Sequence, residues 1–314
     1  MAESSIAEAV SVAWPARVSP LRQAVAALWS FARSRPLGAL GGFICLVILV
    51  VAVSAPWIAP YSYSETNLAD ALEAPSPSHI FGTDELGRDL FSRVVYGARY
   101  DAIIAFGGIA LATFVGTLVG VMCGYLKGSV DLVIQRFVDI AQAVPSLIFV
   151  IMVVAVLGTG IVQVIVPLGL LFGIRESRVI RGAVIALSSR PFVDAVRASG
   201  GTTLYIMWRH ILPNLVPLIV VLASIQIGAL VLTEATISFL GFGVPPPIPT
   251  WGQMLSGSGA LYMEQNPYIA LWPGLAISLL VFGFNMFGDA LRDALDPRLR
   301  GLGIRMRGGA QGGR

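Results

Sequence analysis

Two polar residues within the apolar parts of the chain have side chains that could bind a proton or a cation. Gln226 and Glu234 fall in one hydrophobic run, from about residue 211 to residue 235. An ion-coupled carrier or channel is expected to hold such groups, because ionisable side chains inside a bilayer are costly and usually functional. Glu234 lies near one end of the run, so it either lines a translocation path or caps a helix end. The deep parts of the other runs are nearly free of charge, which weakens the ion-coupled alternative.

No other residues have the types and spacing that enzyme or metal chemistry requires. His79 has no second ligand nearby and is predicted to be an exposed loop histidine, and His210 lies beside Arg209 at the boundary of a span. Cys45 and Cys123 lie inside apolar runs without a histidine or cysteine at ligand spacing. The sequence contains neither a His-Glu-x-x-His nor a Gly-x-Ser-x-Gly motif. We therefore predict no catalytic residue and no metal site.

Lysine usage argues against a nucleotide site in this chain. Lys127 is the only lysine, and Gly128 follows it. A P-loop needs Ser or Thr directly after its Gly-Lys pair, because backbone amides hold the phosphates while the hydroxyl binds magnesium. We predict that this chain binds no cofactor. If a nucleotide drives the protein, another subunit must bind it.

A polar stretch over residues 190–201 separates two hydrophobic runs. Pro191 suits the first turn of a helix and Gly200 with Gly201 would end it, which leaves a helix of about nine residues, too short to cross a bilayer. Its small residues would let the backbone enter a groove of a partner protein, while its charges would fix the orientation. The alternative is an ordinary amphipathic loop between two spans. The residues assigned to the docking role are Arg190, Pro191, Phe192, Asp194, Ala195, Arg197, Ala198 and Gly200.

The composition indicates a membrane protein that crosses the bilayer several times. Of 314 residues, 56% are hydrophobic and 12% are charged, and the mean hydropathy is +0.79, far above that of soluble domains. The net charge of +3 is too small to indicate a nucleic-acid partner, and the basic residues form no patch with interleaved aromatics.

Six hydrophobic runs are assigned as membrane spans, so the predicted fold class is an all-α polytopic membrane protein. The predicted spans cover about residues 37–58, 100–126, 130–157, 160–174, 211–235 and 268–287. Pro145 interrupts the third span. The helix of the fourth is predicted to continue beyond the bilayer, because charged residues follow it at helical spacing. Gly116 and Gly120 in the second span form a pair that lets helices approach closely.

The distribution of charge sets the predicted orientation. With both termini in the cytoplasm, the basic clusters lie inside, as the positive-inside rule requires. The external loops are then an acidic loop within residues 59–98 and an irregular loop over residues 236–267, which has no Lys or Arg and is expected to hold a short re-entrant helix. The predicted divisions are a cytoplasmic lead over residues 1–36 and a first span with its loop over residues 37–98. A core of five further spans follows over residues 99–300, and a flexible basic tail covers residues 301–314.

The docking stretch resembles a loop known from one transporter family. Asp194-Ala195-Val196, then Gly200, then Leu212-Pro213 is similar to the EAA loop of ATP-binding-cassette importer permeases. In that loop Glu-Ala-Ala is followed by glycine four positions after its last residue, and later by Leu-Pro. Asp194 replaces the glutamate, which keeps the charge but shortens its reach, and Val196 replaces the second alanine.

Three further stretches narrow this resemblance to one branch of the family. Residues 81–89 (FGTDELGRD), 209–214 (RHILPN) and 288–298 (GDALRDALDPR) are similar to sequences of the second permease subunit of dipeptide and oligopeptide importers. Together with the EAA-like loop they cover the chain from about residue 37 to residue 300.

The resemblance implies a type I importer half-pore in a bacterial cytoplasmic membrane. The implied partners are a homologous permease, two cytoplasmic ATPases that bind ATP and magnesium, and an external substrate-binding protein. Peptides are the expected substrate, and the alternatives are nickel or another small solute in the same family. An ion-coupled secondary transporter or channel is the alternative from a different class.

Overall fold

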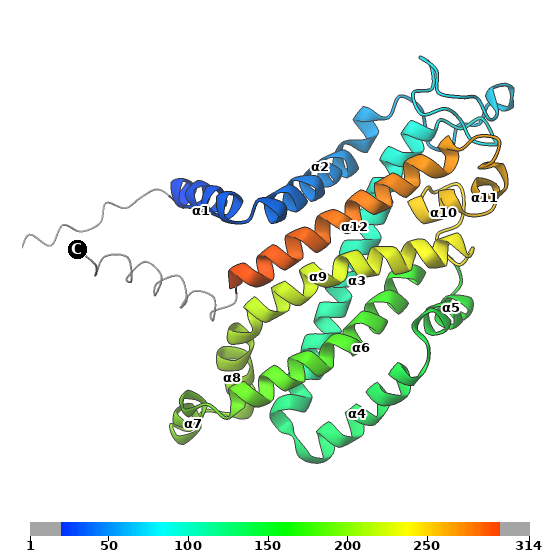
Figure 1. Cartoon of the computed structure of the whole chain (residues 1–314). Helices are drawn as coiled ribbons and strands as arrows, with labels where there is room; N and C mark the ends of the chain where they lie inside the picture. The colour runs from blue at the N-terminus through cyan, green and yellow to red at the C-terminus, as the bar shows by residue number, and fades with distance from the viewer. Residues whose placement is uncertain (1–19, 296–314) are drawn as a thin grey trace, which may run out of the picture.

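The computed structural model describes residues 20–295, and its regular elements in that range are all helices (Figure 1). The long helices are α2 (Pro36–Ile58), α3 (Leu90–Leu126), α6 (Ile161–Ser188), α9 (Leu212–Phe239) and α12 (Tyr268–Leu295). The shorter elements are α1 (Pro20–Ser34), η1 (Leu68–Asp70), α4 (Gly128–Ala143), α5 (Ser146–Leu157), α7 (Pro191–Ala198), α8 (Thr203–Ile206), the π-helical turn η2 (Met207–Ile211), α10 (Trp251–Leu255) and α11 (Ser258–Tyr262). The prediction of an all-α fold is confirmed for these residues. The predicted tail, residues 301–314, and residues 1–19 of the lead lie outside them.

Four helices are long and apolar enough to cross a membrane: α2, α3, α12 and the continuous run Thr203–Phe239, which contains α9. The predicted third span is not one straight helix, because α4 and α5 meet at an angle of 96° and pass the same test only as a pair. Pro145 causes this break. Its ring disfavours the helical conformation of the preceding residue, and Val144 is extended, with φ −79° and ψ 130°. The described residues thus contain four spans, or five if the bent pair counts as one.

Small residues let the central helices α3 and α6 approach closely. A Cβ atom added to Gly116 would lie 2.9 Å from the Cβ atom of Glu176, and one added to Gly120 would lie 2.8 Å from that of Ile180. Any side chain larger than hydrogen would separate these helices. The prediction that this glycine pair serves close helix packing is confirmed.

Small residues also let helix α2 pack closely on α12. A Cβ atom added to Gly38 would lie 2.0 Å from that of Ala290, and one added to Gly41 would lie 2.6 Å from the carbonyl oxygen of Gly283. Figure 1 shows α2 beside α12, on the outside of the bundle. The first span is therefore fixed to the last one by backbone contact.

The buried apolar residues form two separate clusters. The larger one runs through the middle of the bundle and takes residues from α3, α6, α9, α10 and α12. The smaller one lies where α7 and α8 meet the bundle, and it consists of Val121, Ile180, Val184, Val193, Ile206, Met207, Ile211 and Leu215. We call this set the end cluster. Figure 1 places α7 and α8 at one end of the bundle and α10 and α11 at the other; we call these the α7 end and the α10 end.

Candidate functional site

The predicted short helix is present as α7, at the α7 end of the bundle. It begins at Pro191, whose fixed φ suits the first turn, and ends at Ala198. Gly200 follows with φ +85°, a left-handed conformation that favours glycine, and its N–H donates to the carbonyl of Arg197 at 3.0 Å. The N–H of Gly201 donates to the carbonyl of Val196, also at 3.0 Å. Local sequence signals therefore set both ends of this helix.

Helix α7 is anchored by one side chain and exposed around it. The Val193 side chain is fully buried in the end cluster, and Val196 is half-buried against it. All the residues assigned to docking are exposed: Arg190, Pro191, Phe192, Asp194, Ala195, Arg197, Ala198 and Gly200. A helix held by one fully buried side chain and one half-buried side chain, with its remaining surface open, is suited to receive a partner protein.

Arg197 connects α7 to the end of α3. Its Nη1 atom donates to Oδ1 of Asp194 at 3.0 Å, and its Nη2 atom donates to the hydroxyl of Tyr125 at 3.5 Å. The hydrogen bond to Tyr125, and secondarily the Asp194 carboxylate, raises the pKa of the Arg197 guanidinium. Within this chain the Asp194 carboxylate is thus already paired with a neighbour on its own helix.

The connection from α7 to α9 contains a π-helical turn over Met207–Ile211. Pro213 follows in the first turn of α9 and has no N–H to donate to the carbonyl four residues before it, so a wider turn accommodates it. The side chain of Asn214 donates to the carbonyl of His210 at 2.6 Å. The His210 ring lies half-buried, 5.3 Å from the ring centre of Tyr205. The segment 209–214, which is similar to a sequence of the second permease subunit, thus forms the irregular start of a membrane span.

Gln226 forms a hydrogen bond inside the bundle. Its Nε2 atom donates to Oε2 of Glu176 at 3.1 Å, and the Glu176 residue is only 2% exposed. Sequence reasoning placed Glu176 on a helical extension outside the bilayer and did not find this pair. The sequence did contain a signal, because apolar residues recur every four positions along α6 on both sides of Glu176, and the structure buries the whole row: Val164, Leu168, Phe172, Glu176, Ile180 and Val184.

Glu234 lies at the α10 end of α9 and is also 2% exposed. Its Oε1 atom accepts a hydrogen bond from the Ser238 hydroxyl, one turn later, at 2.6 Å. The Glu234 carboxyl is close enough to Asp101 of α3 for the two groups to act on each other electrostatically. Asp101 is 3% exposed. It was not among the predicted site residues, because it lies at the predicted start of its span, next to a polar loop.

A buried arginine joins the two loops at the α10 end. Arg93, 2% exposed, donates from Nη1 to the carbonyl of Tyr63 at 3.0 Å and from Nη2 to Oε1 of Gln253 at 3.2 Å. Its Nε atom lies 3.5 Å from Oδ2 of Asp84, which also accepts from Nε of Arg88 at 2.6 Å. We call Asp84, Arg88, Arg93 and Gln253 the loop clamp. It fixes the acidic loop to α10.

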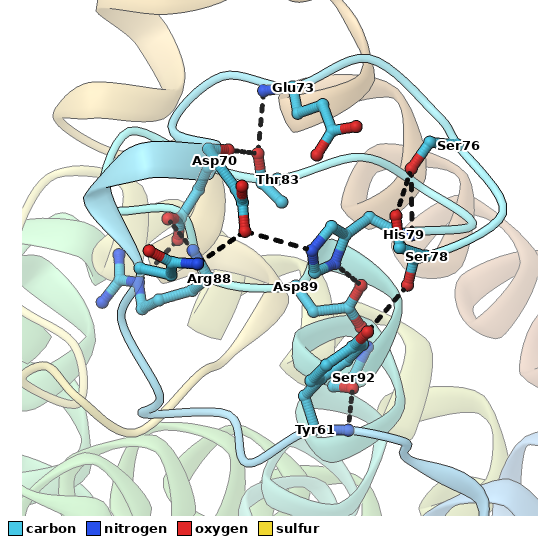
Figure 2. Close-up of polar contacts among 12 residues, drawn as sticks. Tyr61, Asp70, Glu73, Ser76, Ser78, His79, Thr83, Arg88, Asp89 and Ser92 are labelled. Carbon is cyan, nitrogen blue, oxygen red and sulfur yellow. Dashed lines mark hydrogen bonds and ion pairs between the residues drawn. The ribbon is translucent and has the colours of Figure 1, made fainter.

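The prediction of an exposed His79 is wrong, because the acidic loop folds over this residue. His79 is 8% exposed, and its Nδ1 atom lies 3.0 Å from Oδ1 of Asp89. Figure 2 shows the ring between Asp70 and Asp89. Its centre is 4.9 Å from that of the Tyr61 ring. Asp89 also accepts the N–H of Ser92 at 2.7 Å as the N-cap of α3, so the histidine ties the loop to the start of a span.

The predicted short helix within residues 236–267 is present as α10, which is seated on α3. The Trp251 indole nitrogen donates to the carbonyl of Val94 at 2.9 Å, and its backbone N–H donates to Oδ2 of Asp101 at 3.0 Å. The indole covers Gly97, where an added Cβ atom would lie 2.6 Å from the ring. Asn266 adds long contacts from its amide to backbone carbonyls of the acidic loop, at 3.4–3.5 Å.

These features define a class of protein: a membrane-spanning helical protein with an exposed short helix at one end and interlocked loops at the other. Over residues 20–295 no group of three or more His, Cys, Asp or Glu side chains is placed to hold a metal ion. Residues 116–301 match the family described as binding-protein-dependent transport system inner membrane component. Residues 19–75 match the N-terminal TM domain of oligopeptide transport permease C. The chain belongs to this permease family, in its oligopeptide C-type branch.

Relatives with assigned roles match along most of their lengths. The chain is 38% identical to the dipeptide transport system permease protein DppC of Alkalihalophilus pseudofirmus, over 90% of this chain and 91% of that one. It is 38% identical to the oligopeptide permease OppC of Bacillus subtilis, over 85% and 88%. It is 39% identical to the glutathione permease GsiD of Escherichia coli, over 87% and 90%. The protein is a multi-pass permease subunit of an ABC importer in a bacterial inner membrane.

Proposed function

We propose that this chain forms half of the translocation path of an ATP-driven importer for peptides, which an external substrate-binding protein delivers. The relatives described above are named for dipeptides, oligopeptides and glutathione, itself a tripeptide. These names favour peptides over nickel or another small solute. The observation that carries the proposal is the arrangement of α7, whose surface is exposed around a single buried anchor, Val193.

The proposed topology has six spans with both termini in the cytoplasm. It counts the bent pair α4–α5 as one span and adds α6, whose second half carries charged residues. Two of these arginines are paired with α4: Arg181 donates to both carboxylate oxygens of Asp131 at 2.5–2.6 Å, and Arg178 donates to Asp139. Pairing lowers the cost of holding such charges at a membrane boundary. In this orientation the α7 end is cytoplasmic and the α10 end is external.

Two cytoplasmic ATPases are the proposed source of force, and they would bind the ATP and magnesium. When their dimer closes, α7 would move with it. Val193 would transmit that motion to the end cluster, which contains residues of α3, α6 and α9. The helices would then swing as rigid bodies between inward-open and outward-open states, against a homologous permease that forms the other half of the path.

The proposed roles of Gln226 and Glu234 depend on how the path opens. Both side chains contact other helices or their own helix in this structure: Gln226 contacts Glu176, and Glu234 contacts Ser238. We propose that they lie beside the path, where a swing of α9 relative to α3 and α6 would bring them to its surface. The ion-coupled alternative would instead require them to bind an ion during transport.

A substitution of Gly200 tests the docking role of α7. Gly200 and Gly128 both have positive φ, +85° and +60°, and neither has an atom within 4 Å of an added Cβ. Gly128→Trp therefore also places a side chain on a positive-φ position with open space around it, but away from α7, and it serves as the matched control. In the complex reconstituted with its ATPases and binding protein, Gly200→Trp should lower substrate uptake and binding-protein-stimulated ATP hydrolysis about tenfold, equivalent to about 1.4 kcal/mol of docking energy. Equal activity of the two variants would refute the proposal.

A further inference from the structure

Helix α1 has no role in the transport mechanism described above. It covers Pro20–Ser34, and only Arg35 separates it from α2, the first membrane span. Pro36 disfavours a helical Arg35, which has φ −141° and ψ 71°, so α1 and α2 are two helices with a bend between them. Since α2 is apolar from its first turn, α1 ends, at Ser34, at the level where this span leaves the hydrocarbon.

Contacts with the end of α12 hold α1 in place. The Phe31 ring meets the Phe287 ring edge to face, with 6.4 Å between their centres. Arg35 donates from Nη1 to the carbonyl of Ala290 and pairs with Asp293, both at 3.0 Å. Figure 1 shows α1 beside the end of α12. The last turn of α1, at Phe31, and the linking residue Arg35 are therefore in contact with α12.

The exposed side of α1 combines an aromatic ring with arginines. Trp29 is 69% exposed. Arg22, seven residues before it, and Arg33, four residues after it, are also exposed. Residues at these spacings follow one line along a helix. In the sequence, apolar residues recur at intervals of four, three and four from Leu21 to Ala32, which is the spacing of an amphipathic helix. Tryptophan beside arginine is typical of the zone between lipid headgroups and acyl chains.

We propose that α1 lies on the bilayer surface, with Trp29 between headgroups and acyl chains and with Arg22 and Arg33 on the phosphates of anionic lipids. The position follows from the direct connection to α2, and the headgroup chemistry follows from the two arginines. The surface meant is that of the cytoplasmic leaflet, and only this choice of leaflet rests on the proposed function. Because α1 also holds the end of α12, the lipid contact would fix the ends of the first and last spans at the membrane surface.

The test measures where two neighbouring positions lie relative to lipid. Nitroxide labels are attached to Trp29→Cys and, as the matched control, to Ser30→Cys in the full chain with Cys45→Ala and Cys123→Ala, in nanodiscs of POPE and POPG. Ser30 is exposed and lies about 180° around the helix from the middle of the apolar stripe. The label at position 29 should be relaxed more by oxygen than by a water-soluble nickel chelate, and the label at position 30 should show the reverse. Equal exposure of both labels to the chelate would overturn the proposal.

Two further measurements separate lipid from protein and test the headgroup chemistry. In the otherwise natural chain, a photo-crosslinking residue at position 29 should form adducts with the mass of a phospholipid, even if the cysteine-free chain does not fold; adducts to protein would overturn the proposal. In nanodiscs of POPC alone, or with Arg33→Gln in POPG, the label at position 29 should move toward water. An unchanged depth would overturn the assignment to anionic headgroups. These assays need neither ATPase nor binding protein, so their failure is distinct from failure of the transport proposal.

Discussion

The backbone N–H of Trp251 donates to Oδ2 of Asp101 at 3.0 Å, which joins α10 to α3 across 150 residues of sequence. Asp101 is 3% exposed, and within the described residues its other oxygen has no hydrogen-bond partner. The backbone N–H at the start of α10 thus depends on one carboxylate oxygen, beside the bonds that the Trp251 indole and Gln253 make. Since a buried N–H left without a partner is costly, loss of this acceptor should lower the stability of the chain by more than the net contribution of one hydrogen bond.

Asp101→Ala should therefore lower the free energy of unfolding by about 1–3 kcal/mol, whereas Asp101→Asn, which keeps an acceptor oxygen, should lose much less. Thermal unfolding of the purified chain would measure both. Ser278→Ala is the control, because this exposed hydroxyl only bonds a carbonyl of its own helix. If the alanine and asparagine variants lose equal stability, the acceptor is not what holds α10.

The loop clamp should behave as one energetic unit. Arg93→Ala would leave Asp84 buried with one arginine partner instead of two and would free Gln253, so we expect a loss of about 3–5 kcal/mol. A double-mutant cycle of Arg93→Ala with Gln253→Ala should give a coupling energy of at least about 0.5 kcal/mol. Hydrogen exchange across residues 59–89 and 250–256 reports the same coupling. Additive effects, with independent exchange of the two loops, would show that Arg93 does not join them.

Sequence reasoning succeeded where a signal is local. Pro191 and Gly200 mark the ends of α7 whatever lies around them, and Pro145 marks the bend between α4 and α5. It failed for His79 and Glu176, whose burial depends on segments that fold over them. Asp89 is ten residues from His79, and Gln226 is fifty residues from Glu176. Local sequence patterns do not identify partners so far apart in the chain, although the apolar residues spaced four apart along α6 indicate that Glu176 faces inward.

The hydrogen bond between Gln226 and Glu176 gives a prediction in which two substitutions do less harm than one. Gln226→Leu should destabilise the chain by about 1–3 kcal/mol, because it leaves a buried carboxyl without its side-chain donor. Adding Glu176→Leu removes the orphaned group and should restore part of that loss. Thermal unfolding of both single variants and of the double variant decides the point. A double variant whose loss equals the sum of the single losses would contradict the pairing.

Val193 and Phe192 are adjacent on α7 and should have separate roles. Val193 is fully buried in the end cluster, whereas Phe192 is 37% exposed. Val193→Ala should lower stability by about 1–3 kcal/mol and, because it loosens the joint between α7 and the spans, should lower the amount of substrate imported per ATP hydrolysed. Phe192→Ala should leave stability unchanged and weaken binding of the ATPases. Val156→Ala, at a position that is 82% exposed, controls for loss of the same two methyl groups. Uptake and hydrolysis measured together in the reconstituted complex would distinguish these outcomes. If Val193→Ala kept the wild-type ratio of import to hydrolysis, force would reach the spans by a route other than the end cluster.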